Sequence, residues 1–321
     1  MELKPEIVEK IKLLDKKYAA MGQDLNSYLE GLLYADYLTY WNYIHLDTLL
    51  SLQSPLTNIP DEEIFIMYHQ VTELYFKLCI HEFKQICNEP NLKADFLLMR
   101  VNRINRYFDA LTLSFDIMSE GMEKEQFLKF RMSLLPASGF QSAQYRMIEV
   151  YTTPFTNLMH KDFRGKYAEV PADAEIEKMF EHIYWKEGAT ELATGKKTLT
   201  LRQFEEKYAH QIIKLAQEYK TKNIWMRFNQ LPESDRKNPK LIEAFQNLDI
   251  NVNVNWPLAH YKTAVAYLHK NPDDIAATGG TNWQKYLPPR FQKRMFFPTL
   301  WTDAEKEEWG KQWVKKNVFK Q

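Results

Sequence analysis

Glycine is scarce in this chain, with 10 residues among 321, whereas globular proteins average about 7%. Few positions can therefore adopt a positive φ angle without strain, which disfavours hairpin-rich β folds and glycine-rich nucleotide loops. Cysteine is scarcer still, because Cys79 and Cys87 are the only two and form no CxxC pair. This composition predicts a mostly helical protein of a reducing compartment.

Neither sign of charge dominates, because 42 Lys and Arg residues balance 42 Asp and Glu residues. Nucleic-acid-binding proteins normally carry a net basic charge, so we expect no nucleic-acid partner. The chain also lacks any apolar run near the roughly 18 residues that a membrane-spanning helix requires. Hydrophobic residues make up 45% of the chain, which suffices for a large buried core. We expect a cytoplasmic protein without a membrane segment.

Helical spacing of apolar residues is clearest in the N-terminal half of the chain. Between Ser27 and Ser51 the apolar residues leave little polar face, so this segment must be covered on most sides. Asp61 predicts an N-cap for a long helix that continues to about Cys87. The other helices expected in this half begin at Pro5, Asn91, Glu123 and Gln141.

The pattern changes between residues 153 and 255, where charges are dense and prolines frequent. We expect two or three helices there, the clearest from Leu201 to Tyr219, forming a subsidiary layer. Residues 251–255 alternate with period two, which indicates a short strand or an extended linker. Pro257 then suits the first turn of an apolar helix that ends at His269.

Conventional catalytic motifs are missing. Gly188 and Gly195 are separated by six residues where a phosphate-binding P-loop requires four. His81-Glu82 lacks the second histidine of a zinc-protease motif, because Gln85 occupies that position. For an enzyme of this size, the shortage of acid, base and nucleophile motifs suggests that a cofactor supplies the chemistry.

Four features could contribute to a site, although each has a simpler structural interpretation. His69 lies among aromatic and aliphatic neighbours, and His260 opens an apolar helix, but either could be an ordinary core histidine. Arg131 is either a surface ion-pair partner or a clamp for a carboxylate. The double glycine after Thr278 is either a simple turn or a backbone cradle for a carboxylate or ammonium group.

Taken together, several sequence blocks resemble the tryptophan 2,3-dioxygenase family of haem enzymes. The resemblance covers about residues 38–150 and 256–298, whereas residues 153–255 cannot be matched. The matching blocks are Leu38-Thr39-Tyr40-Trp41-Asn42-Tyr43, Phe65-Ile66 with His69-Gln70, Arg100-Val101-Asn102-Arg103, Phe130-Arg131, Pro136-Ala137-Ser138-Gly139-Phe140-Gln141-Ser142, and Trp256 with His260 followed by Thr278-Gly279-Gly280.

The resemblance implies a role for individual residues. His260 corresponds to the axial ligand of the haem iron, and His69 to the distal histidine that hydrogen-bonds the indole N–H group. Arg131 corresponds to the carboxylate clamp, and Thr278 to the residue that meets the ammonium and carboxylate groups of the substrate. The remaining implied contacts are Phe65 and Phe127 around the indole ring, Ser138, Gly139 and Phe140 beside the cofactor, and Tyr40, Tyr43 and Ile44 in the pocket of a neighbouring subunit.

The resemblance also implies the fold and its organisation. We expect an all-α, haem-binding helical bundle assembled as an intertwined homotetramer. Residues 1–60 would be exchanged with a neighbouring subunit, residues 61–152 and 256–321 would form the core that binds haem and substrate, and residues 153–255 would be the subsidiary helical region.

The implied reaction is the first step of the kynurenine pathway. Haem b and O2 would cleave the indole C2–C3 bond of L-tryptophan, or of a close aromatic analogue, to give N-formyl-L-kynurenine. One alternative is a related haem oxygenase that hydroxylates an indole or another aromatic amino acid. A second is a protein that binds haem or an aromatic ligand without catalysis.

The chain departs from the family pattern near the expected substrate. Pro257 replaces the arginine that usually follows the tryptophan, Ala277 replaces a glycine, and Thr281-Asn282-Trp283 replaces a Ser-Ser-Gly-like continuation. These changes bear more on substrate identity than on haem binding.

Overall fold

The computed structural model describes residues 3–36, 38–134, 139–167, 171–190, 195–267, 289 and 293–310. The chain divides into two compact units, residues 1–54 and residues 55–321. Helices dominate both units, and the described residues contain only isolated β-bridges instead of strands. The all-α prediction is therefore confirmed. None of the described helices is both long and apolar enough to cross a membrane.

The first unit contains helices α1 (Pro5–Ala20), α2 (Leu25–Tyr34), α3 (Tyr40–Tyr43) and α4 (Leu46–Leu49). Asp24 caps α2 by accepting hydrogen bonds from the N–H groups of Asn26 and Ser27. His45 adopts a left-handed conformation with φ of 52°, which separates α3 from α4. Many large apolar side chains of this unit are exposed within the single chain, among them Leu32, Leu33, Tyr34, Tyr40, Trp41, Tyr43 and Leu50.

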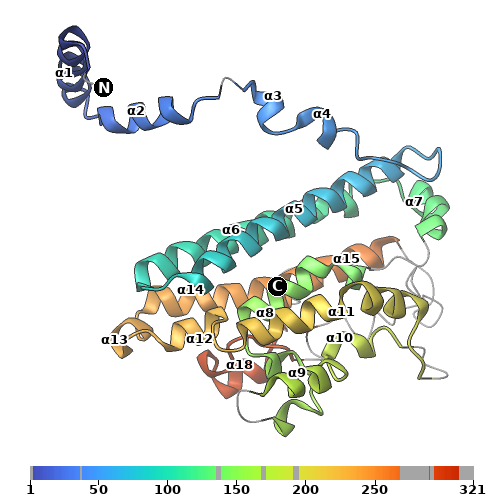
Figure 1. The fold of residues 1–321 in the computed structure, drawn as a ribbon. Coiled ribbons are helices and arrows are strands. Elements are labelled where there is room, and N and C mark those ends of the chain that lie inside the picture. Colours follow the sequence, from blue (N-terminus) through green and yellow to red (C-terminus); the bar gives the residue numbers. More distant parts are fainter. Residues whose placement is uncertain are drawn as a thin grey trace. The chain divides into compact units, whose positions relative to one another are not determined.

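The second unit is built on two long helices, α5 (Asp61–Asn88) and α6 (Ala94–Ser119), which lie side by side in Figure 1. From Tyr68 in α5 and from Leu97 in α6, buried residues recur about every three or four positions, so each helix has a largely apolar face that packs on the other helix and on helices that follow later in the chain. Glu82 joins the two helices by accepting hydrogen bonds from Arg100 at 2.9 Å and Arg103 at 3.3 Å.

Shorter elements follow the long pair. They are α7 (Lys124–Phe130), η1 (Arg131–Leu134), η2 (Gly139–Gln141), α8 (Ala143–Thr152), η3 (Phe155–Leu158), η4 (Arg164–Lys166), α9 (Asp173–Phe180), α10 (Tyr184–Glu187), α11 (Leu199–Tyr219), α12 (Ile224–Asn229), α13 (Glu233–Arg236), α14 (Pro239–Ile250), η5 (Asn251–Asn255), α15 (Trp256–Tyr267), η7 (Pro298–Leu300) and α18 (Asp303–Glu307). The helix predicted from Leu201 to Tyr219 is confirmed as α11.

The start of α5 differs from the N-cap prediction. The N-cap position is Pro60, and Asp61 is already helical. The Asp61 carboxylate accepts a hydrogen bond from the Glu123 N–H at 2.6 Å, so it ties α5 to the start of α7 instead of capping its own helix. Glu62 accepts hydrogen bonds from the N–H groups of Leu56 and Thr57 and thereby holds the preceding loop.

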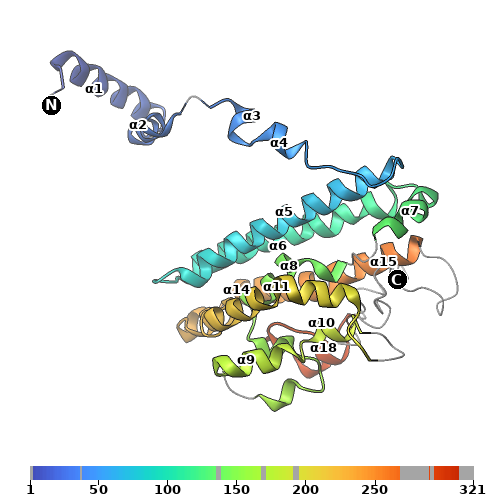
Figure 2. The ribbon, with the colours of Figure 1, turned by 45° about the vertical axis from the view of Figure 1, so that its right-hand side comes forward.

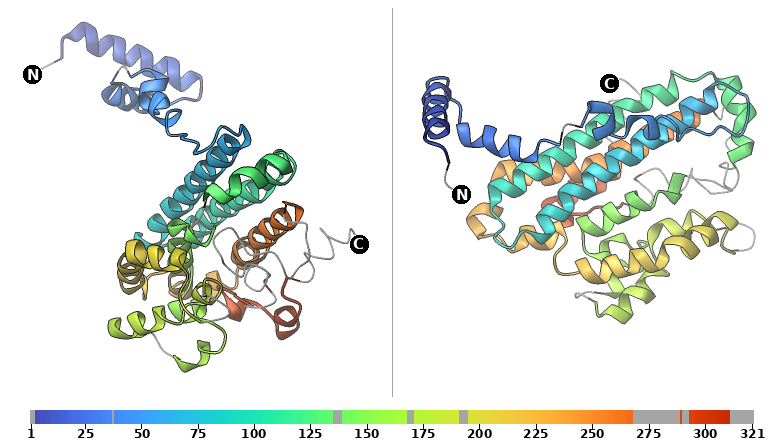
Figure 3. Two further views of the ribbon diagram at one scale, coloured as in Figure 1. Left: turned by 90° about the vertical axis from the view of Figure 1, so that its right-hand side faces the viewer. Right: turned by 45° about the horizontal axis from the view of Figure 1, so that its top comes forward.

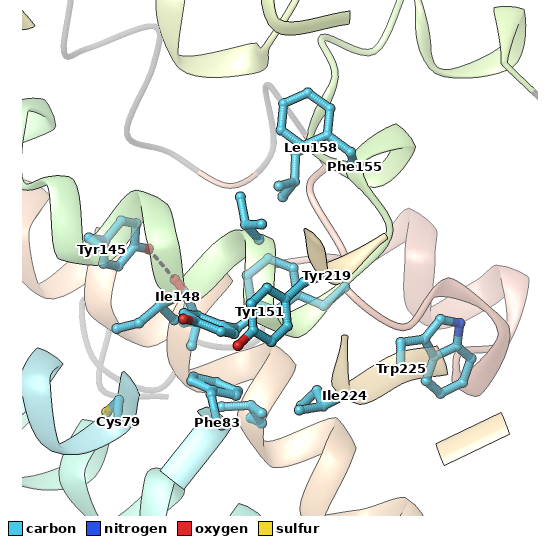
Figure 4. Packing of buried hydrophobic residues seen from close by; sticks show 14 of the residues in the cluster. Cys79, Phe83, Tyr145, Ile148, Tyr151, Phe155, Leu158, Tyr219, Ile224 and Trp225 are labelled. Carbon is cyan, nitrogen blue, oxygen red and sulfur yellow. Dashed lines mark hydrogen bonds between the residues drawn. The ribbon is translucent and has the colours of Figure 1, made fainter. Parts of the chain in front are cut away.

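One large cluster of buried apolar side chains joins α5, α6, α8, α11, α12 and α14. Figure 4 shows part of this cluster, with Phe83 below Tyr151 and Tyr219 nearby. Residues between 153 and 255 contribute directly to it, including the fully buried Trp185 and Phe204. Cys79 and Cys87 lie in the same cluster as free, buried thiols.

The prediction of a strand or linker at residues 251–255 is wrong. These residues form η5, a π-helix that joins α14 to α15 in one continuous rod, which Figure 2 shows. Asn253 donates a hydrogen bond to Asp249 and Asn255 donates one to Asn251, each across four positions, as helical side chains do. Pro257 consequently lies inside this rod instead of beginning a separate helix.

The C-terminal segment packs against the same rod. Asp249 accepts hydrogen bonds from the N–H groups of Phe296 and Phe297 and from Trp301 Nε1. The Trp309 ring is buried and lies 5.1 Å from Trp301 between ring centroids.

Candidate active site

His69 lies in the N-terminal half of α5, one turn after Phe65. Its Nδ1 lies 2.7 Å from the Phe65 carbonyl oxygen. A carbonyl oxygen only accepts hydrogen bonds, so Nδ1 carries the proton and Nε2 presents a lone pair. The ring is therefore oriented by its own helix and offers an acceptor on its opposite edge.

The surroundings keep the His69 ring neutral. Burial among protein atoms lowers the pKa of His69, and only its hydrogen bond to Phe65 and the Glu73 carboxylate oppose this effect. The side chain nevertheless retains exposed surface. A neutral, exposed imidazole can offer its Nε2 lone pair to a bound molecule.

His260 lies in α15, far from His69 in the chain. Burial lowers the pKa of His260 to about 4, and electrostatic repulsion from His69 adds to the effect. Ring contacts connect the two histidines, because the Tyr68 ring lies 5.7 Å from the His69 ring and 5.9 Å from the Phe115 ring, between ring centroids. Helix α6 positions α15, because the two helices pack together, as Figure 3 shows. Its Phe115 ring lies 5.7 Å from the His260 ring at an interplanar angle of 24°.

Aromatic rings surround the two histidines. The Phe65 ring lies 4.1 Å from His69 and 6.3 Å from Phe127, between ring centroids. Phe127 in turn lies 4.8 Å from Tyr267 at the end of α15. These rings belong to a second buried cluster, separate from the large core, which we call the aromatic cluster; its members include Ile64, Phe65, Tyr68, Phe115, Met118, Met122, Phe127, Trp256, Ala259 and Tyr267.

Arg131 lies at the point where α7 passes into η1, directly after Phe127 and Phe130. Its side chain is half-buried, and burial lowers its pKa from the ordinary value of 12.5. A guanidinium group remains charged at neutral pH even so. Arg131 therefore carries a positive charge one helical turn after Phe127, a member of the aromatic cluster.

The structure does not bring every predicted site residue to this cluster. The Phe140 ring lies in the large core, 6.1 Å from Trp185, so its side chain packs there and not against the histidines. Tyr40, Tyr43 and Ile44 belong to the first unit. Gly139 begins η2, whereas Ser138 and Thr278 lie outside the described residues.

Phe115 and Tyr267 are parts of the site that sequence reasoning missed. Phe115 continues the apolar spacing of α6 after Phe108 and Leu111, and all three are buried. This spacing indicates a core face, which is the correct local interpretation. Only the packing of α15 against α6 places the Phe115 ring beside His260.

The fold and the candidate site define an all-α protein in which two histidines from different helices, α5 and α15, lie against one cluster of aromatic rings. Residues 30–233 match the family model described as tryptophan 2,3-dioxygenase. A protein of that name from Bacillus thuringiensis subsp. konkukian is 30% identical over 275 residues, covering 82% of this chain and 91% of the relative. One from Bacillus cereus is 31% identical over 278 residues, with the same coverage.

A third relative of the same name, from a Ruegeria species, is 37% identical over 118 residues, which cover 36% of this chain and 42% of the relative. The chain belongs to the tryptophan 2,3-dioxygenase family, a family of oxidoreductases. The resemblance identified from its sequence blocks is therefore confirmed.

Proposed function

We propose that this enzyme uses haem and O2 to cleave the indole C2–C3 bond of L-tryptophan, giving N-formyl-L-kynurenine. The observation that carries the proposal is that His69 and His260, from different helices, both lie against rings of the aromatic cluster, with Phe65 4.1 Å from His69 and Phe115 5.7 Å from His260 between ring centroids. Family membership supports the same reaction, because the relatives are named for it.

The residues around His260 fit haem b. A neutral imidazole has the lone pair that an iron ligand needs, and burial keeps His260 neutral down to a pH of about 4. Phe115 and Trp256 provide apolar, planar surroundings for a macrocycle. His260 would hold the iron, and the bound haem would supply O2 activation.

The other residues of the site would bind and orient the substrate. Phe65 and Phe127 would hold the indole ring, and the His69 Nε2 lone pair would accept a hydrogen bond from the indole N–H. Arg131 would pair with the substrate carboxylate through two charge-assisted hydrogen bonds. These contacts place the reacting bond without requiring His69 to remove a proton.

The first unit would complete the pocket of a neighbouring subunit. Tyr40 and Tyr43 are 71% and 74% exposed in the single chain. An exposed apolar patch of this kind marks an interaction surface. We propose that Tyr40, Tyr43 and Ile44 reach a partner's site within a homotetramer, and that Ser138, Gly139 and Thr278 complete the haem and substrate contacts.

Absorption spectroscopy and product analysis test the proposed reaction. Protein expressed with a haem supply should bind one haem per chain, and its ferrous spectrum should change on addition of CO and of L-tryptophan. The product should contain two added oxygen atoms. One added oxygen would instead show a hydroxylase, and tight haem binding without turnover of any indole would show a binding protein.

Two histidine variants separate the proposed roles. His260→Ala should lose haem or show an altered ferrous spectrum, because the axial ligand is gone. His69→Ala should retain haem and lose turnover or substrate affinity. A full complement of haem with an unchanged spectrum in His260→Ala would show that another residue binds the iron.

A further inference from the structure

One backbone carbonyl in the rod before His260 is left without its usual donor. In an α-helix the N–H of residue 256 would bond to the Val252 carbonyl. The Trp256 N–H instead bonds to Asn251, as the π-helix requires. The next candidate donor in the π pattern is residue 257, but Pro257 has no N–H group.

A side chain from another helix fills this position. The Tyr145 hydroxyl of α8 donates a hydrogen bond to the Val252 carbonyl oxygen at 2.9 Å, and a dashed line marks this bond at Tyr145 in Figure 4. Tyr145 and Val252 are both buried. A buried carbonyl without a partner is costly, so this contact satisfies a real requirement of the π-helix.

Buried polar groups hold Tyr145 in place. Arg294 donates a hydrogen bond to the Tyr145 hydroxyl oxygen at 3.2 Å, which leaves the hydroxyl proton for Val252. The same guanidinium pairs with Glu149 of α8 and donates to Asn253 of the π-helix. Tyr145 is therefore fixed between the π-helix and the C-terminal segment.

We propose that Tyr145 is a positioning residue for His260: it replaces the N–H that Pro257 lacks and so fixes the direction in which α15 leaves the π-helix. This inference rests on the proposed function, because it takes His260 as the iron ligand. His260 lies one turn beyond Pro257, so a change at the π-helix reaches it within a single helical turn.

A double-mutant cycle of Tyr145→Phe and Pro257→Ala tests the inference on the full-length chain. Tyr145→Phe removes only the hydroxyl, and we expect haem to bind about tenfold more weakly, with an altered ferrous spectrum. Pro257→Ala restores a backbone N–H near Val252. In that background Tyr145→Phe should weaken haem binding by no more than about threefold.

Tyr151→Phe is the matched control, because Tyr151 is buried on the same helix α8 and belongs to the same core. It should leave the haem spectrum unchanged. An equal effect of Tyr145→Phe with and without Pro257→Ala would overturn the inference, and so would an unchanged spectrum in Tyr145→Phe.

The thermal midpoint of the haem-free chain separates this inference from the proposed function. Tyr145→Phe should lower the midpoint by about 2–4 °C with Pro257 present and by less in Pro257→Ala. A wild-type chain that binds no haem would contradict the proposed function, and with it the role of Tyr145 in positioning His260 toward iron. If the two substitutions changed the midpoint additively, Tyr145 and Pro257 would not act on the same carbonyl, that of Val252.

Discussion

At the scale of single residues, Arg131 is the side chain proposed to pair with the substrate carboxylate. It is the half-buried cation that the structure places beside Phe127 and Phe130. Removing one partner of a desolvated charge pair typically costs about 2–5 kcal/mol, since the other charge is left without its match. A pair between Arg131 and a carboxylate would therefore favour amino acids over simple indoles.

We predict that Arg131→Ala lowers kcat/KM for L-tryptophan by roughly 30-fold or more, at about 1.4 kcal/mol per tenfold. Tryptamine, which lacks the carboxylate, should lose much less. Arg131→Lys is the control that keeps the charge without the paired N–H geometry, and it should be intermediate. Equal losses for L-tryptophan and tryptamine in Arg131→Ala would mean that Arg131 supports the fold instead.

His69 should act as a hydrogen-bond acceptor toward the indole N–H. The loss of one neutral hydrogen bond in His69→Ala should reduce kcat/KM for L-tryptophan roughly 3- to 10-fold. His69→Gln, which retains an acceptor oxygen, should recover part of this loss. An analogue methylated on the indole nitrogen has no N–H to donate, so the reduction should disappear for it; an equal reduction for both substrates would contradict the assignment.

At the scale of elements, the rod of α14, η5 and α15 depends on Asp249. This carboxylate is fully buried and receives hydrogen bonds from Asn253 within the rod and from the C-terminal segment. Burial raises the pKa of Asp249 to about 6 from its ordinary value of 3.8, despite those hydrogen bonds. The folded state therefore binds a proton more readily than the unfolded state between these two pH values.

We predict that the ionisation of Asp249 lowers the free energy of unfolding as the pH rises from about 4 to 6. Above that range the lowering persists but no longer changes with pH. Asp249→Asn should remove this slope, whatever its effect on stability at neutral pH. Denaturation of both proteins at several pH values measures the difference in slope. Carboxyl groups whose pKa is lowered in the folded state, such as Glu181, make the free energy of unfolding fall as the pH drops below their ordinary pKa. This effect is the same in the wild type and in Asp249→Asn, so it cancels in the comparison. Parallel pH curves would contradict the prediction.

At the scale of the whole molecule, α2 exposes large apolar side chains that would be covered in the proposed tetramer. Leu32 and Leu33 are 71% and 83% exposed. We predict that Leu33→Ser shifts the assembly toward smaller species and lowers activity, as measured by ultracentrifugation and turnover. Leu199→Ser is the matched control, because Leu199 is also an exposed leucine but lies in the second unit. A monomer with full activity would contradict the proposed tetramer.

Mixed oligomers test whether the first unit acts on a neighbouring subunit. A Tyr43→Ala chain keeps its own His69, and a His69→Ala chain keeps its Tyr43. If Tyr43 enters a partner's pocket, co-expression of the two chains should create some intact sites and restore activity. If Tyr43 serves its own chain, no mixed oligomer contains an intact site and activity should stay low.

The amino-acid sequence by itself determined the all-α fold and the family. Apolar residues at helical spacing and a shortage of glycine are local signals, and α5, α6 and α11 follow them closely. The Ser138-Gly139-Phe140-Gln141-Ser142 block, and Trp256 with His260 followed by Thr278-Gly279-Gly280, indicated the family because they are specific in combination.

Tertiary structure alone decided the features that depend on distant partners. The alternation at residues 251–255 indicated a strand or an extended linker, but the segment packs against α6 and the C-terminal segment and continues α14 into α15 as a π-helix. Asp61 and Glu62 bond to α7 and to the preceding loop, which no local pattern indicates. The placement of His69 and His260 against one aromatic cluster likewise requires α5, α6 and α15 to pack together, because a side chain's neighbours in space are set by the folded chain and not by its neighbours in sequence.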